Sequence, residues 1–320
     1  MKAIRVNRLG EPDVLELVEM PDPEVRPGEV VVKIYAIGVN PVETYIRAGL
    51  QGYGRSVPYT PGSDCAGVVH SVGAGVTSVA EGDRVYTSGS LSGTYAQYTL
   101  CTEKHLHRLP EVVSFEQGAA IGIPYATAYR ALFHRANVQP GETVLIHGAS
   151  GGVGIAATQL ARAHGLQVIG TAGTQEGRDL VLQQGAHHVL DHYQPECLAQ
   201  AAALCPSGSI DVILEMLANQ NLGDDLTVLS KGGRVVVIGS RGTVVINPRD
   251  TMSRDASILG MALMNATDIE MARLHAALVA GLESGVVRPV IGREFQLAEA
   301  AQAHQAILES AAVGKVILLP

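Results

Sequence analysis

The stretch that most constrains how this chain folds is the glycine-rich segment His147–Gly154, HGASGGVG. It follows an apolar run, Thr143–Ile146, with the length and composition of a buried strand, and it leads into residues 153–164, whose apolar positions recur with a helical period. Glycines let such a turn bend sharply and approach a pyrophosphate, whose charge is held by N–H groups at the helix start. The spacing is G-x-x-G-x-x-G rather than the usual G-x-G-x-x-G. The segment predicts the first strand, turn and helix of a dinucleotide-binding fold; the alternative is a glycine-rich turn without a ligand.

The second half of the chain continues as an alternation of strands and helices. Residues 210–216 are apolar almost throughout, as expected when helices cover both faces of a sheet. Six strands joined by crossover helices predict a doubly wound parallel sheet. We expect strands at residues 143–146, 167–171, 188–190, 210–216, 234–239 and 257–263, and helices at residues 153–164, 176–184 and 222–230.

The first third has a different pattern, made of short strands and turns. Alternating runs at Lys2–Val6 and Glu29–Gly38 are separated from further short strands by turn signals such as Pro61-Gly62. This pattern predicts an antiparallel, partly open barrel. Ser114 and Gln117 have the spacing of a capping box, which predicts two helices through residue 133, broken near Pro124.

The last fifty residues hold two helices and two short strands, at residues 290–291 and 315–319. We expect this segment to return to the first domain.

Composition excludes several classes of protein. A net charge of −8 argues against a dedicated nucleic-acid binder, which carries a basic face. The four cysteines form no C-x-x-C pair and are expected to be free thiols in a reducing compartment. The N-terminus lacks the apolar core of a signal peptide, and no run approaches the roughly 20 apolar residues of a membrane span. We expect a cytoplasmic protein without a membrane segment.

Several long motifs, in the same order along nearly the whole chain, resemble the zinc-free quinone reductases of the zeta-crystallin type in the medium-chain dehydrogenase/reductase superfamily. The resemblance implies an α/β protein with a GroES-like, mostly-β barrel domain (residues 1–122 and 264–320) and a doubly wound Rossmann domain (residues 123–263). The sequence departs from the family in a shorter N-terminus and in residues 192–208. The matching segments are residues 38–47, 58–64, 118–125, 147–154 and 239–242.

No metal site is expected. Zinc members of the superfamily carry a catalytic cysteine where this chain aligns Asn40, and their Gly-His-Glu segment is replaced here by Gly62-Ser63-Asp64. Without a cysteine cluster, tetrahedral sulfur or nitrogen ligation has no source. His188 and His192 are spaced i, i+4, but the residues between them indicate a strand, so the two side chains would not share a helix face.

The end of the second Rossmann strand predicts NADPH as the cofactor. NAD-binding folds place an acidic residue there for the ribose hydroxyls, whereas residues 170–174 contain none. This leaves room for a 2′-phosphate, with Arg178 as a nearby cation and His192 in the next loop as another candidate contact. The alternative for Arg178 is a solvated helix charge.

The resemblance also implies individual site residues. Asn40 and Tyr45 are candidates for the nicotinamide end, and Tyr53 and Tyr59 for a flat wall against a quinone, with a partly buried barrel residue as the alternative for each tyrosine. No catalytic residue is identified, and His147 is expected to be a hydrogen-bonded core histidine rather than an acid. The implied cofactor contacts are Tyr45, Ser150, Gly151, Gly152, Val153, Gly173, His192, Asn221, Ile238, Gly239, Ser240, Arg241, Met261, Ala262 and Leu263.

The predicted function is therefore NADPH-dependent reduction of a quinone without zinc, since hydride transfer is the chemistry of the nicotinamide itself. One alternative is reduction of activated carbon–carbon double bonds, with Tyr45 or Tyr53 as a proton donor. Another is a non-catalytic, crystallin-like or RNA-binding protein, although RNA binding as the main role conflicts with the acidic charge. The resemblance implies a homodimer or homotetramer, paired through the apolar strand that ends near Leu263.

Overall fold

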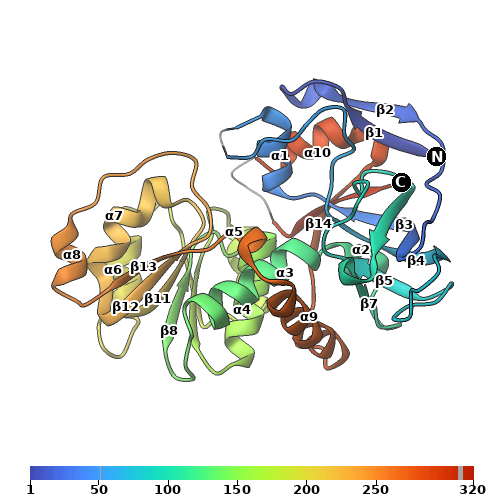
Figure 1. Ribbon diagram of the computed structural model, residues 1–320. Helices are drawn as coiled ribbons and strands as arrows, with labels where there is room; N and C mark the ends of the chain where they lie inside the picture. The colour runs from blue at the N-terminus through green and yellow to red at the C-terminus, as the bar shows by residue number, and fades with distance from the viewer. Residues whose placement is uncertain (51, 309–312) are drawn as a thin grey trace. The chain divides into compact units, whose positions relative to one another are not determined.

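The computed structural model describes residues 1–50, 52–308 and 313–320. The chain forms two compact units, Met1–Ile123 with His275–Pro320, and Pro124–Leu274. Both chain ends therefore belong to the first unit (Figure 1). The predicted second boundary, after residue 263, falls earlier than the division found here, because the helix α9 (Asp268–Glu283) contributes its first half to the second unit.

The first unit is built on a seven-stranded sheet in the order β14-β15-β3-β4-β5-β7, with β6 paired to β3. Its longest strand, β3 (Glu29–Gly38), pairs antiparallel with β4 (Asp64–Val72) and with β15 (Lys315–Leu319). The C-terminal segment thus returns to the first unit, as predicted from the sequence. The other strands of the unit are β1 (Lys2–Val6), β2 (Leu15–Glu19), β5 (Arg84–Thr87), β6 (Tyr98–Thr102), β7 (Leu106–Arg108) and β14 (Ile291–Gln296).

Short helices cover this sheet. The helix α1 (Pro41–Ala48) has Asn40 as its N-cap, whose N–H donates to Glu43 Oε2, and it ends at Gly49 in the left-handed conformation (φ 69°). The predicted capping box at Ser114 is confirmed, since the Ser114 hydroxyl accepts from the Gln117 N–H at 3.2 Å. Helices α2 (Phe115–Ala119) and α10 (Ala300–Ala306) complete the unit, together with 3-10 turns at 12–14, 103–105 and 297–299.

The second unit contains a six-stranded parallel sheet in the order β10-β9-β8-β11-β12-β13, which confirms the predicted doubly wound topology. Its central strand, β8 (Thr143–Ile146), is buried at every residue. The other strands are β9 (Gln167–Thr171), β10 (His188–Leu190), β11 (Ile210–Glu215), β12 (Leu229–Val237) and β13 (Ser257–Gly260).

Helices lie on both faces of this sheet, with α4 and α5 on one side and α6 and α7 on the other (Figure 1). Leu145, Ile213 and Val235, from three adjacent strands, belong to one buried apolar cluster with residues of α6 and α7. The helices are α4 (Gly152–Ala163), α5 (Gln175–Gln183), α6 (Cys197–Ala203), α7 (Ala218–Val228) and α8 (Pro248–Met252). α3 (Gly122–Tyr129) continues as a π-helix over Arg130–Arg135, and a 3-10 turn spans Leu263–Asn265.

Several predicted bounds are wrong, and the largest errors are five residues: β12 starts at Leu229 rather than 234, and β14 ends at Gln296 rather than 291. The helix break lies before α3 rather than at Pro124. Pro124 stands in the first turn of α3, where backbone N–H groups have no partner within the helix, so the missing N–H of proline costs no hydrogen bond. α7 begins at Ala218 rather than 222, because its start lacks a side-chain cap signal, and the carboxylate of Glu215 accepts the Leu217 N–H instead.

Candidate cofactor and active site

The glycine turn predicted from the sequence lies between β8 and the N-terminus of α4. Gly148 has a positive φ of 58°, which favours glycine, and its N–H donates to the Thr171 hydroxyl at 3.2 Å. The Ala149 N–H donates to the Thr171 carbonyl at 2.8 Å. The turn is therefore held to the end of the neighbouring strand β9, and α4 begins at its far end.

The glycines of this turn have different surroundings. A Cβ on Gly154 would lie 2.5 Å from Ala149 Cα and 2.6 Å from the Gly148 carbonyl oxygen, so this glycine allows the helix to pack against the turn. A Cβ on Gly151 would meet only the Gly148 carbonyl oxygen, at 3.7 Å. The space beside Gly151 is thus open within the unit, at a helix N-terminus whose dipole and N–H groups favour an anion. This cradle fits a pyrophosphate.

The residues predicted at the adenosine end lie beside one another. A Cβ on Gly173 would lie 2.8 Å from His192 Nε2 and 2.5 Å from the ring of Tyr193. Tyr193 is 62% exposed and meets the His192 ring edge to face at 4.5 Å. Sequence reasoning missed Tyr193, although an exposed aromatic next to a predicted cofactor residue is a usable signal.

Arg178 has an acidic partner that the sequence did not reveal. Its guanidinium lies 3.2 Å from Asp191 Oδ2, and it donates to the Ala172 carbonyl at 3.3 Å. Asp191 follows β10, the strand next to β9, and its carboxylate faces the guanidinium of Arg178. The guanidinium is therefore held at the end of β9, next to Gly173, rather than left as a solvated helix charge.

The remaining predicted contacts also follow the carboxyl ends of parallel strands, which share one edge of the sheet. Asn221 lies in α7, after β11, and residues 238–241 follow β12. The Arg241 N–H donates to Asn219 Oδ1 at 2.8 Å. Residues 261–263 follow β13, where the Met261 N–H donates to the Val237 carbonyl at 2.9 Å.

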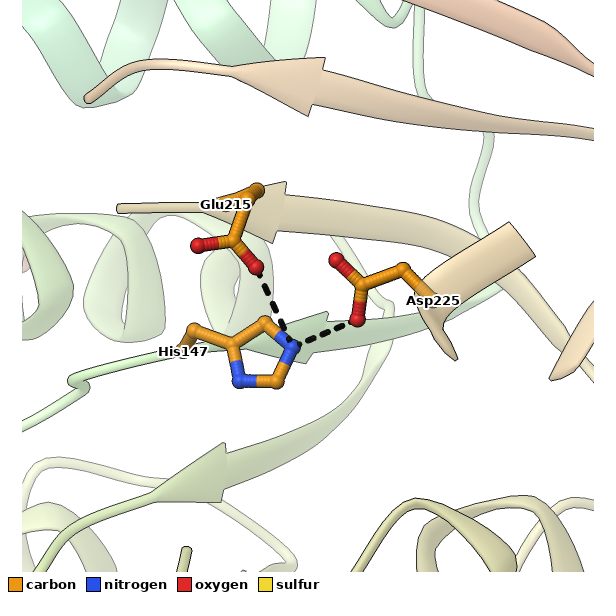
Figure 2. A group of neighbouring side chains, drawn as sticks. All are labelled: His147, Glu215 and Asp225. Carbon is orange, nitrogen blue, oxygen red and sulfur yellow. Dashed lines mark hydrogen bonds and ion pairs between the residues drawn. The ribbon is translucent and has the colours of Figure 1, made fainter. Parts of the chain in front are cut away.

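Beneath this edge lies a buried polar cluster of His147, Glu215 and Asp225 (Figure 2). His147 Nε2 lies 2.8 Å from Asp225 Oδ1 and 3.5 Å from Glu215 Oε2. The prediction that His147 is a hydrogen-bonded core histidine is confirmed. Its two carboxylate partners were missed, because they come from β11 and α7, far away in the sequence.

Burial dominates the electrostatics of this cluster. Desolvation raises the pKa of Glu215 to about 7, although His147 lowers it, and desolvation also raises the pKa of Asp225 to about 7. Burial lowers the pKa of His147. Within the cluster, the hydrogen bond between His147 and Asp225 holds the imidazole in place. Ligand atoms within 4.8 Å of one another would also admit a cation.

Glu215 connects this cluster to a predicted cofactor residue. Its Oε1 accepts from Asn221 Nδ2 at 3.2 Å and from the Leu217 N–H, while Oε2 faces His147. His147 directly precedes the glycine turn. The cluster thus joins the turn after β8 to the turn after β11.

In the first unit, α1 carries Tyr45, whose ring lies 5.5 Å from that of Tyr53. Both side chains are partly exposed. Tyr59 is 6% exposed and belongs to the apolar core of the unit, and its N–H donates to the Val6 carbonyl. The structure therefore brings Tyr45 and Tyr53 together, and it supports the alternative for Tyr59, a buried barrel residue.

Asn40 lies in a second buried polar cluster. Its Nδ2 donates to Asp64 Oδ2 at 2.9 Å, and its Oδ1 accepts from the ammonium of Lys315. Lys315 Nζ lies 3.8 Å from Asp64 Oδ2, and the Asn40 N–H donates to Glu43 Oε2 at 2.9 Å. Both polar atoms of the Asn40 side chain thus have partners inside the unit, and the residue is 1% exposed.

A chain of hydrogen bonds extends this cluster. The Tyr95 hydroxyl donates to Glu43 Oε2 at 2.7 Å and lies 3.0 Å from His304 Nε2. Burial raises the pKa of Glu43 to about 7 and lowers that of His304 to about 3. His304 therefore stays neutral at physiological pH.

Comparisons with known proteins match the two-unit organisation. Residues 26–111 match the family described as alcohol dehydrogenase GroES-like domain, and residues 152–279 match the family described as zinc-binding dehydrogenase. The chain is 51% identical over 323 residues to a human quinone oxidoreductase, covering 100% of this chain and 98% of the relative.

Solved structures give the same result. The crystal structure of an Escherichia coli quinone oxidoreductase complexed with NADPH matches with a TM-score of 0.91 and 29% identity, covering both chains completely. The quinone oxidoreductase of Thermus thermophilus, also solved in complex with NADPH, matches with a TM-score of 0.87 and 33% identity over the full length of both chains.

Proposed function

Since the chain belongs to the quinone oxidoreductase family of the medium-chain dehydrogenases and reductases, we propose that it is an enzyme that reduces a small quinone with NADPH. The single observation that carries this proposal is the glycine turn. It leaves open space beside Gly151, at the N-terminus of a twelve-residue helix, on the edge where the predicted cofactor residues of the second unit lie. Human, bacterial and other relatives bear the name quinone oxidoreductase.

The residues of the second unit would bind NADPH along this edge. Ser150, Gly151, Gly152 and Val153 would hold the pyrophosphate, with Gly173 and His192 at the adenosine end. Asn221, residues 238–241 and residues 261–263 would line the rest of the path. When bound, the nicotinamide supplies the hydride, so the chain itself positions and desolvates the reactants.

Arg178 supports a preference for NADPH over NADH. Its guanidinium is held near Gly173 by Asp191, and an arginine fork suits a phosphate. Relatives have been crystallised with NADPH. We assign Arg178 and His192 to the 2′-phosphate.

On the substrate side, the structure supports Tyr45 and Tyr53 as the residues of the first unit that meet the reactants, since both rings are adjacent and partly exposed. Asn40 is assigned a positioning role, because its amide is used within the unit. Quinone carbonyls accept electrons readily, so solvent or a tyrosine hydroxyl suffices as the proton source.

The test is steady-state oxidation of NADPH and NADH by the purified protein, with a small ortho-quinone, a para-quinone, an alkenal or no acceptor. Quinone-dependent oxidation of NADPH, at least tenfold faster than that of NADH, is the expected result. Turnover of the alkenal alone would assign reduction of carbon–carbon double bonds. Tight NADPH binding without any turnover would indicate a non-catalytic protein.

We also propose that the protein is a homodimer or a tetramer of dimers in the cytoplasm. β13 lies at the edge of the parallel sheet, where it pairs with β12 and with no strand on its other side in the described residues. All four cysteines are free thiols, as expected in a reducing compartment. None of the helices in the described residues is long and apolar enough to cross a membrane. Light scattering of the purified protein tests the assembly.

A further inference from the structure

The buried ammonium of Lys315 has an unusual set of partners. Lys315 is 4% exposed, and its Nζ donates to Asn40 Oδ1 and lies 3.8 Å from Asp64 Oδ2. Both partners are themselves buried, at 1% and 0% exposure. A buried charge is tolerated only where it is paired and hydrogen-bonded. These contacts therefore define a built site for one cation.

The backbone around this site is shaped to admit the lysine side chain. A Cβ on Gly38, at the end of β3, would lie 2.1 Å from the Ala119 carbonyl oxygen, 3.0 Å from Asp64 Cβ and 3.1 Å from Lys315 Cε. A Cβ on Gly122 would lie 2.3 Å from Asp64 Oδ1, and the Ile123 N–H donates to this carboxylate at 2.9 Å. Glycines thus make the space in which the ammonium and the carboxylate meet.

The donor set does not fit the zinc ion that the description of the matching family implies. The superfamily resemblance aligns Asn40 with the catalytic cysteine and Ser63 with the histidine of the Gly-His-Glu segment, and neither an amide nor a hydroxyl is the sulfur or nitrogen ligand that zinc prefers. A second cation beside the ammonium would also be repelled in a medium of low dielectric constant.

We propose that the Lys315 ammonium is the fixed cation of this buried cluster, and that it acts as a positioning residue for α1. Because an ammonium only donates, it turns the Asn40 oxygen toward itself and directs the amide group to Asp64. Asn40 is the N-cap of α1, and the Asn40 N–H donates to Glu43 in the first turn.

The consequence reaches the candidate active site. Tyr45 lies on α1, two residues after Glu43, and its ring meets that of Tyr53. The ammonium therefore fixes the start of the helix that carries the tyrosine assigned to the reactants. This step rests on the proposed function, whereas the cation site itself does not.

A double-mutant cycle in thermal unfolding tests the cation site without any assay of turnover. Lys315→Met leaves Asp64 buried without its cation and is expected to lower Tm by about 10 °C. The double variant Lys315→Met/Asp64→Asn removes both charges and is expected to regain at least half of this loss. The proposal would be overturned if the losses of Tm in Lys315→Met and Asp64→Asn simply add in the double variant, or if the Tm of Lys315→Met lies within about 2 °C of the wild type.

Chemical rescue distinguishes the effect of the Lys315 charge from the effect of the side-chain volume. Propylammonium supplies the atoms missing in Lys315→Ala and is expected to raise its Tm and to restore quinone KM toward the wild-type value, whereas 1-propanol of the same size does neither. Equal effects of the two compounds would show that the site needs volume rather than a cation.

Cobalt(II) absorption tests the metal directly. The wild-type protein is expected to bind no Co²⁺ at Asp64. Added Co²⁺ should therefore give no visible absorption that the variant Asp64→Asn lacks. A stoichiometric spectrum that disappears in Asp64→Asn would contradict the assignment of Lys315 as the cation. A wild type inactive toward quinones would refute the proposed function alone, since the unfolding and cobalt measurements are independent of turnover.

Discussion

One added methyl group separates the two roles of the glycine turn. In Gly154→Ala the new Cβ would lie 2.5–2.7 Å from backbone atoms of Gly148 and Ala149, none of which can swing away as a side chain would. The helix must therefore move by several tenths of an ångström. Overpacking of this kind costs about 1–3 kcal/mol, of which up to about 1 kcal/mol is offset by the better helix propensity of alanine.

Gly151→Ala is the matched control, because its new Cβ makes only an ordinary contact at 3.7 Å. The backbone there, at φ −81° and ψ 172°, is open to any residue. Its stability should stay within about 1 kcal/mol of the wild type or rise slightly. The methyl group would, however, occupy the space assigned to the pyrophosphate.

Differential scanning fluorimetry and calorimetric titration with NADPH read out both roles. We expect Gly154→Ala to lower Tm by roughly 3–8 °C. We expect Gly151→Ala to keep its Tm and to weaken NADPH binding by about tenfold or more, or about 1.4 kcal/mol. If Gly151→Ala binds NADPH as tightly as the wild type, the turn does not hold the pyrophosphate, and the reasoning fails.

Three further predictions follow from the charged groups. Because the pKa of Glu215 is raised to about 7, its contribution to stability is present below pH 4.5 and is lost as pH rises through about 7. In urea unfolding, Glu215→Gln should remove on the order of 2–3 kcal/mol of this pH dependence. An unchanged pH profile of the variant would show that Glu215 is not its source. The pKa of His304 is lowered to about 3, so its contribution to stability is present above pH 6.5 and is lost as pH falls toward 3. His304→Gln should therefore lose less unfolding free energy between pH 6.5 and 3 than the wild type does. An equal loss in the variant would show that other groups cause the acid destabilisation. Arg178→Ala should weaken NADPH binding by about tenfold while leaving NADH binding unchanged, and equal losses for both cofactors would rule out a contact with the 2′-phosphate.

The fold was predictable where the pattern of apolar residues along a segment matches the burial of that segment in the folded protein. The buried strand Thr143–Ile146, the following turn and α4 lie within one residue of their expected positions. The long strand Glu29–Gly38 has the predicted bounds. The start of α7 was not predictable in the same way, since its N-cap residue, Leu217, makes no side-chain capping hydrogen bond that a sequence pattern could reveal.

The polar clusters could not be read from the sequence, because their members are distant along the chain. Asn40 and Lys315 are 275 residues apart, and His147 and Asp225 are 78 residues apart. A pattern of types and spacings gives no reason to pair them, and the contacts appear only once β15 joins β3 and α7 packs on the sheet. The same holds for Asp191, which follows a different strand from the one that positions Arg178.

The measurement that tests the central claim most directly is the rate of quinone-dependent NADPH oxidation before and after exhaustive treatment with a strong zinc chelator. The account predicts rapid oxidation that requires the quinone, prefers NADPH to NADH, and is unchanged by the chelator, because the cofactor supplies the hydride and the cluster of Asn40, Asp64 and Lys315 does not fit zinc. Activity that disappears with the chelator and returns with added zinc would contradict it.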